Sequence, residues 1–195
     1  MKTAVEKTQR QLTFDAYDSE SDTRLREMIL YIAHKCGDNS RFGAIKLNKV
    51  LFYADFYAYA LTGRPITGSQ YMRLQHGPVP ARLLPVRNDM VTSGDIKVVH
   101  DQHFGFRQTR IVPLRPPQLD IFSATEVTIV NDVIDHLWEK SATQVSEESH
   151  LKPWQIAGHR GLIPYEAVFL SDEGATRYDE LRAQELIREH KWTDV

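Results

Sequence analysis

Cysteine is almost absent from this chain: Cys36 is the only one in 195 residues. A single thiol excludes an internal disulfide and any zinc or iron–sulfur site built from several cysteines. We expect Cys36 to be a packing residue. No stretch approaches the ~18–20 apolar residues of a membrane helix, and the polar N-terminus lacks the apolar core of a secretory signal. We therefore expect a cytoplasmic protein with no membrane partner.

An excess of charge of one sign is also missing. The chain has 24 basic and 26 acidic residues, a formal net charge of −2. This balance gives no global basic field, so we do not expect nucleic acid as a partner. A local basic group remains in the region of a predicted hairpin. One interpretation of this group is a β-ribbon that binds DNA or RNA. The other, which we prefer, is that the charges discourage the exposed strand edges from pairing with other strands. The group consists of Lys97, Arg107, Arg110 and Arg115.

Motifs for chemistry are absent as well. The histidines do not show the i, i+4 spacing of a helical metal pair. No nucleophile–base pair or glycine-rich phosphate loop is visible. We expect no metal, no cofactor, no catalytic residue and no enzymatic activity.

What the chain does contain is an ordinary globular composition, with 42% hydrophobic and 26% charged residues. We expect residues 1–20 to form a polar leader and residues 21–195 to form one domain. The predicted order of helices, a short strand, a hairpin and more helices indicates an α+β fold. It is predominantly helical, with a small antiparallel sheet.

Two helices are predicted in the first third of the domain. The first begins at an N-cap at Asp22 or Thr23 and ends at Gly37. The second spans residues 44–61 and is apolar nearly all round, which places it at the centre of the domain. Gly63 ends it as a C′ residue, and Pro65 prevents its continuation.

The middle of the chain predicts strands. Residues 70–74 read as a short strand, and Pro80 suits the first position of the next helix. Pro85 either kinks that helix or marks its true start. Residues 96–99 and 108–112 predict a hairpin.

Capping signals place the remaining helices. Capping boxes open helices at Ser123 and at Ser141, the first running to Trp138 and the second ending near His150. Pro153 starts a turn that carries Trp154, which we expect to be a buried anchor. A final helix is predicted through residue 190.

Candidate binding residues cluster on the second helix. Lys46, Lys49, Tyr53 and Tyr57 share one face at i, i+3 or i+4 spacing. One interpretation is a partner-binding stripe, because tyrosine is enriched at interface hot spots. The other is that the tyrosines pack inward and the lysines are solvated. We prefer the second interpretation and keep the four residues as candidates.

Three further residues are singled out, Asp55 on this helix and Arg73 and His76 after it in the chain. Asp55 sits among aromatic residues and needs a partner, for which Arg73 on the following strand is the expected one. His76 precedes a tight turn at Gly77-Pro78, where it contacts a ligand or, as we prefer, bonds to the backbone. Arg73 and His76 complete the set of candidate partner-binding residues.

A set of motifs in this order resembles the Panacea domain, also called the SocA-like antitoxin family. The first is residues 46–55, Lys-Leu-Asn-Lys-Val-Leu-Phe-Tyr-Ala-Asp, and the second is residues 61–65. The third is residues 76–80, His-Gly-Pro-Val-Pro. The last are residues 149–154, which end on Pro153-Trp154, and residues 163–166. Together they span about residues 24–170. The resemblance makes Asp55, Gly63, Pro65, Gly77, Pro78 and Trp154 the structural residues of the motifs.

The resemblance implies an antitoxin that neutralises a cognate toxin by direct protein–protein binding. In one branch of the family the antitoxin is a proteolytic adaptor for an AAA+ protease, and other members are phage-associated. The sequence departs from the family pattern at Pro85 and lacks an appended DNA-binding domain. Alternatives are a nucleic-acid-binding repressor and a phage-associated interaction module, and a homo-oligomer is left open.

Overall fold

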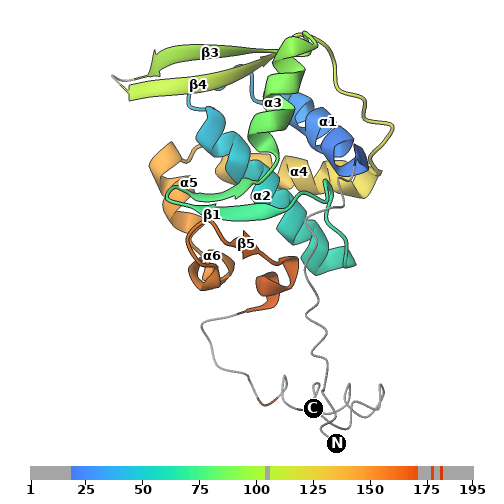
Figure 1. Cartoon of the computed structure of the whole chain (residues 1–195), viewed down its shortest axis with the longest axis vertical. Coiled ribbons are helices and arrows are strands. Elements are labelled where there is room, and N and C mark those ends of the chain that lie inside the picture. The colour runs from blue at the N-terminus through green and yellow to red at the C-terminus, as the bar shows by residue number, and fades with distance from the viewer. Residues whose placement is uncertain (1–18, 104–105, 171–176, 178–180, 182–195) are drawn as a thin grey trace, which may run out of the picture.

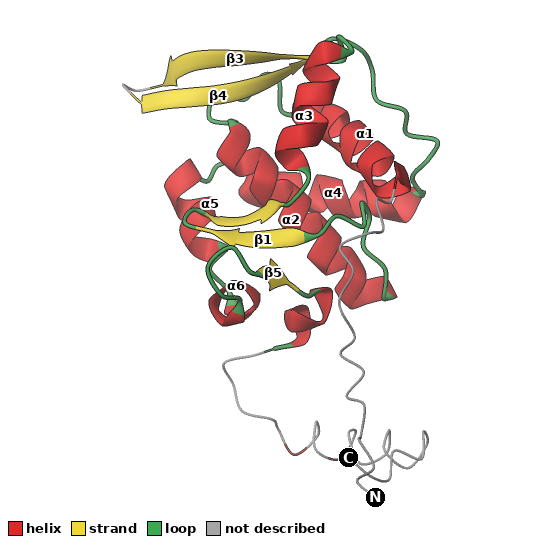
Figure 2. Ribbon diagram, in the orientation of Figure 1, coloured by secondary structure: helices red, strands yellow, loops and turns green. Residues whose placement is uncertain are grey.

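The computed structural model describes residues 19–103 and 106–170, together with Arg177 and Leu181. The predicted leader lies outside the described residues except at its last two positions, and so does most of the predicted final helix. The fold is α+β and mostly helical, with two small antiparallel sheets (Figures 1 and 2). The predicted fold class is confirmed.

Helix α2 (Ala44–Thr62) runs through the middle of the molecule (Figure 1). It packs against α1 (Ser19–Lys35) and α4 (Ala124–Leu137) in one hydrophobic core. Its aliphatic residues from Leu47 to Ala58 are buried together with Phe52 and Phe56, whereas Tyr53 is half-buried and Tyr57 is 49% exposed. Leu61 is an exception to the predicted apolar face, because 58% of it is exposed.

The ends of these helices follow the local sequence. Helix α1 begins at Ser19, three residues before the predicted cap at Asp22. Gly63 adopts the left-handed conformation (φ 74°) and its N–H bonds to the Tyr59 carbonyl, so the predicted C′ glycine is confirmed. Pro65 lies in the loop beyond it.

The first sheet has the strand order β2-β1-β5, with both pairs antiparallel. Strand β1 (Tyr71–Leu74) pairs with β2 (Gly77–Pro80), and Tyr71 lies opposite Pro80. Strand β5 (Leu162–Ile163) covers the other edge of β1 and was not predicted, because two residues carry no periodic signal.

The predicted start of the third helix is wrong. Pro80 lies in strand β2, and α3 spans Leu83–Thr92. Pro85 therefore falls in the first turn of α3, where the backbone N–H groups have no partner within the helix and a proline is tolerated. Pro85 therefore marks the start of this helix and does not kink its middle.

The second sheet is the predicted hairpin of β3 (Ile96–His103) and β4 (Phe106–Pro113), longer at both strands than predicted. It projects from the end of the molecule opposite α6 and β5 (Figure 1). Beyond it, Arg115 binds the buried Glu27 carboxylate and Asp95, with ion-pair distances of 2.6 and 2.7 Å. This network fastens the segment that follows β4, which contains Pro116 and Pro117, to α1.

The C-terminal elements follow from two capping boxes. Ser123 and Glu126 cap α4, and Ser141 and Gln144 cap α5 (Ala142–Glu148), as predicted. They are followed by α6 (Lys152–Ile156) and by the 3₁₀ helix η1 (Tyr165–Phe169), which was not predicted. Among the described residues, no helix combines the length and the apolar character needed to cross a bilayer.

Candidate partner-binding surface

The turn between β1 and β2 is held by the buried side chain of Lys49. This lysine projects from the middle of α2 and is 1% exposed. Its ammonium donates to the carbonyl oxygens of His76 (2.5 Å) and Pro78 (3.3 Å). Burial lowers the pKa of Lys49 to about 7. Lys49 is thus a structural clamp beneath the turn.

Gly77 sits between the two carbonyls that Lys49 binds. It has φ 96°, and a Cβ there would overlap the Lys49 ammonium and the Ser149 hydroxyl. The Ser146 hydroxyl also donates to the His76 carbonyl (3.0 Å). The His-Gly-Pro turn is therefore packed between α2 and α5 with no room for a side chain at its centre.

Asp55 is completely buried and lies among hydroxyl groups. Its carboxylate accepts hydrogen bonds from the Thr67 backbone N–H (2.7 Å), the Thr67 hydroxyl and the Tyr71 hydroxyl (2.8 Å). The Tyr165 hydroxyl approaches to 3.5 Å and donates to the Ser69 carbonyl. Burial raises the pKa of Asp55. This network ties α2 to β1 and η1.

The predicted ion pair between Asp55 and Arg73 is wrong. The strand crosses Asp55 at Tyr71, and Arg73 lies two residues, roughly 6.6 Å, further along. The Arg73 guanidinium instead lies 4.0 Å from the centre of the Trp154 ring and donates to the Ala157 carbonyl (2.6 Å).

Trp154 stacks with His150 as well as with Arg73. The centroids of the His150 and Trp154 rings are 4.0 Å apart, with an interplanar angle of 20°. The Trp154 indole N–H donates to the Leu74 carbonyl (3.0 Å). Burial lowers the pKa of His150. The half-buried Trp154 thus anchors α6 to strand β1, in the role that the sequence predicted, although it is not fully buried.

An apolar groove of about 350 Å³ opens between α2, α6 and η1. Tyr57 forms one wall, with 49% of its surface exposed, and Leu151 and Leu170 form the other side. The groove is also lined by Phe52, Tyr53, Phe56, Lys152, Pro153 and Val168. It differs from the Lys49 and Asp55 sites in being open to solvent.

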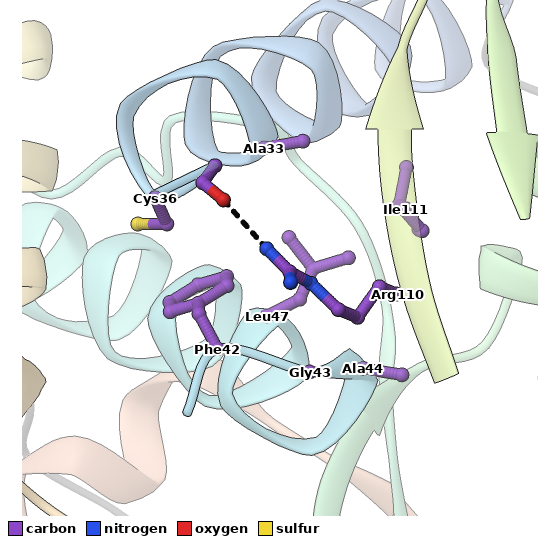
Figure 3. A pocket seen from close by; sticks show the side chains of 9 residues that line it. Ala33, Cys36, Phe42, Gly43, Ala44, Leu47, Arg110 and Ile111 are labelled. Carbon is purple, nitrogen blue, oxygen red and sulfur yellow. Dashed lines mark hydrogen bonds between the residues drawn. The ribbon is translucent and has the colours of Figure 1, made fainter. Parts of the chain in front are cut away.

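A second, smaller cavity lies between strand β4 of the hairpin and the adjacent ends of α1 and α2. It measures about 20 Å³, the room of about one water molecule. Figure 3 shows Arg110 reaching from β4 to the carbonyl of Gly37 beside it, with Cys36 on the wall. Cys36 is buried, and burial raises the pKa of its thiol to about 12, so it stays protonated. This agrees with its predicted packing role.

Comparison with protein-family models matches residues 47–155 to a family described as antitoxin SocA-like, Panacea domain. The chain belongs to the Panacea family. The match runs from α2 through most of α6 and covers the Lys49 clamp, Asp55, the His-Gly-Pro turn and Trp154. No curated protein and no solved structure matches the chain.

The Panacea match begins inside α2, whereas the hydrophobic core also includes α1. The predicted resemblance, over about residues 24–170, is confirmed in its central part. The division into a leader at residues 1–20 and a domain at residues 21–195 stays a prediction.

The structure separates the six candidate binding residues of this Panacea domain. Lys46 and Lys49 are buried, so neither the stripe nor the solvated-lysine interpretation holds for them. Lys46 donates to the Trp138 carbonyl (2.8 Å) at the C-terminal end of α4, where a cation complements the helix dipole. Burial lowers its pKa.

Of the other four candidates, two reach the groove and two do not. Tyr53 and Tyr57 line the groove, the first half-buried and the second exposed. Arg73 stacks on Trp154, and the side chain of His76 is exposed beside the clamped turn. The structure places these side chains; their part in binding stays a prediction.

Sequence reasoning missed several residues that shape this surface. Leu151, Phe169 and Leu170 are large, apolar and exposed around the groove, yet they fall in short segments with no helical or strand periodicity. Tyr165 lies in a motif of the family resemblance, but nothing in the sequence links it to Asp55. The only sequence signal for Tyr165 was its position as an aromatic residue in a segment without helical or strand periodicity.

The basic residues of the hairpin do not form one free surface. Arg110 binds the Gly37 carbonyl and Arg115 binds Glu27 and Asp95, whereas Lys97 and Arg107 are exposed. Half of the group is therefore committed to internal contacts. This arrangement does not favour a nucleic-acid ribbon.

Proposed function

We propose that this protein is an antitoxin that neutralises a cognate toxin by direct binding. The observation that carries the proposal is the match of residues 47–155 to the antitoxin SocA-like Panacea domain. The toxin is the expected partner, and the protein acts on it through contact and not through a reaction.

The chemistry of the buried groups supports a role without catalysis. The thiol of Cys36, the amine of Lys49 and the carboxylate of Asp55 are each at most 1% exposed. None of them can meet a substrate without opening of the core. Among the described residues, no group of three or more His, Cys, Asp or Glu side chains is placed to hold a metal ion.

The exposed end of α2 supports the groove as the toxin-contact surface. Tyr57 offers a large, rigid ring at the groove wall, and tyrosine is among the residues that dominate interface energetics. A stable interface needs roughly 800 Å² from each partner around such anchors. We assign Tyr57 and the groove around it as the centre of this contact.

The test is co-expression with the product of the adjacent gene. The expected results are rescue of growth from a lethal neighbour and a stoichiometric complex on purification. Tyr57→Ala should weaken the complex at least tenfold with little change in melting temperature, because Tyr57 is half-exposed. Leu84→Ala, at a similarly exposed apolar residue on α3, is the matched control and should leave binding unchanged.

Two results would contradict the proposal. A non-lethal neighbour that never co-purifies would remove the antitoxin function, and equal losses of binding in Tyr57→Ala and Leu84→Ala would remove the groove assignment. Delivery to an AAA+ protease is a separate step of the proposal. It predicts that the toxin's half-life falls when the antitoxin and the protease are both present, whereas steric neutralisation leaves the half-life unchanged.

A further inference from the structure

The groove between α2, α6 and η1 has exposed apolar side chains along both of its sides. On α2, Tyr57 lines the groove and Leu61 continues the row one turn further on; they are 49% and 58% exposed. Their i, i+4 spacing places them next to each other on one face of the helix. On the other side, Leu151 and Leu170 line the groove and are 49% and 48% exposed. Apolar surface of this extent on a folded domain indicates a contact site.

The backbone around the groove offers no strand edge, and this limits the form of a partner. The α2 wall is helical, and among the described residues that line the groove none belongs to a strand. On the other side, the N–H groups of Trp154 and Gln155 bond to the Leu151 carbonyl. The N–H of Leu170 bonds to the Ala167 carbonyl. An extended peptide buried here would leave its own backbone groups without partners, at about 1–3 kcal/mol for each group.

An α-helix avoids this cost, because its backbone groups are paired within the helix. A helix that lies beside the row of Tyr57 and Leu61 has the same axial repeat as α2, about 6 Å for every four residues. Its own residues at i, i+4 and i+7 then face the groove together. Large apolar side chains at these positions would fill the hollow of about 350 Å³ between Tyr57 and Leu151. This is the helix-in-groove mode of recognition.

The charge of the lining indicates which polar residues such a helix carries. Among the described residues that line the groove, Lys152 is basic and none is acidic. Glu148 lies near Tyr53, but its carboxylate is paired with Lys140 at 2.6 Å. An acidic side chain on the flank of the helix is therefore attracted to the lining, whereas a basic one is repelled. The attraction acts at the surface, so it contributes more to selectivity than to affinity.

We propose that the groove binds an amphipathic α-helix of the partner, with large apolar residues facing Tyr57 and Leu151 and acidic residues on its flank. The inference rests on the proposed function in one respect, because the toxin is the protein expected to carry this helix. The preference for a helix of this kind follows from the groove itself. It can therefore be measured without the toxin.

A synthetic peptide added to the full-length protein provides the test. The probe is an alanine-based helical peptide of about 18 residues, with leucine at i, i+4 and i+7, glutamate on both flanks and a fluorescent label. Fluorescence polarisation should show saturable binding with a Kd of roughly 10–100 µM. Tyr57→Ala and Leu151→Ala should each raise this Kd at least fivefold. Leu84→Ala is the matched control, because Leu84 is similarly exposed but lies on α3, and it should leave the Kd unchanged.

Two control peptides separate the apolar stripe and the charge from general adhesion. One has the same composition with its leucines spread around the helix, and the other carries lysine in place of glutamate. Both should bind at least fivefold more weakly, and Lys152→Gln should reduce the difference between the acidic and the basic peptide. The proposal is overturned by no saturation of the first peptide at about millimolar concentration, by equal binding of either control peptide, or by equal losses in Leu84→Ala and Tyr57→Ala.

A second experiment with the neighbouring gene product separates this proposal from the antitoxin function. The photo-reactive residue p-benzoylphenylalanine in place of Leu61 should capture a toxin segment with apolar residues at i, i+4 and i+7 and acidic residues beside them. Capture of a segment without this pattern, or of a basic one, overturns the proposal and leaves the antitoxin function in place. Binding of the acidic peptide without binding of the neighbouring gene product does the reverse.

Discussion

The buried amine of Lys49 predicts an unusual pH dependence of stability. Its pKa falls from an ordinary 10.5 to about 7 in the folded protein because burial penalises the charged form. Between these two values the unfolded chain carries a proton that the folded chain lacks. The free energy of unfolding therefore rises with pH across this window, by up to about 1.4 kcal/mol for each pH unit.

The size of the effect can be worked out for accessible conditions. From pH 6 to pH 9, the Lys49 contribution should rise by about 2 to 3 kcal/mol. Lys49→Met removes the titrating group and keeps most of the side-chain volume. It also removes the bonds to the His76 and Pro78 carbonyls, a loss that we expect to be about 1–3 kcal/mol and independent of pH.

Urea unfolding of wild type and Lys49→Met at several pH values from 6 to 9 measures this difference. The stability of wild type relative to the variant should increase with pH. Lys97→Met, at an exposed lysine on β3, controls for the change in net charge and should give a curve parallel to wild type. A wild-type-minus-Lys49→Met difference that stays flat over this range would refute the reasoning about burial.

Three further substitutions test the packing around the turn, the buried carboxylate and a helix cap. Gly77→Ala should lower the free energy of unfolding, measured with urea, by about 3 kcal/mol or more. Gly94→Ala, at a glycine with φ 76° and open space around its Cβ, should lower it by only about 1 kcal/mol. Similar losses in the two variants would show that the turn above Lys49 has room for a side chain. Asp55→Asn should lower stability by about 2–4 kcal/mol, since the amide cannot accept from Thr67 and Tyr71 as the carboxylate does, and an unchanged urea midpoint would contradict this. Ser123→Ala should cost about 1 kcal/mol through the lost capping box of α4, visible as an earlier thermal midpoint; a midpoint equal to wild type would show that the box is not stabilising.

Local chemistry explains most of the fold that the sequence predicted. Gly63 ends α2 and the two Ser-initiated capping boxes begin α4 and α5, because these signals act within a few residues. Pro80 shows the limit of such reasoning. A proline at the first helical position and a proline at a strand end have the same local geometry, and only the pairing with Tyr71 decides between them.

The candidate site was harder to predict, because it depends on contacts between distant segments. Lys46 and Lys49 were expected in water, yet both bury their stems and end on carbonyls from α4 and the β1–β2 turn. Asp55 takes partners from a loop, a strand and η1 in place of Arg73. Helical spacing states which residues share a face but not what that face meets.

Helix α2 carries its buried polar side chains and its exposed tyrosine on different sides of the helix. Lys49 and Asp55 point into the interior, whereas Tyr57, two residues after Asp55, opens to solvent. Substitutions at Tyr57 and at the neighbouring Leu61, Leu151 and Phe169 therefore leave the interior bonds intact. A library randomised at these four positions should remain folded while its recognition changes, which makes this face a practical starting point for redirecting the scaffold to new targets.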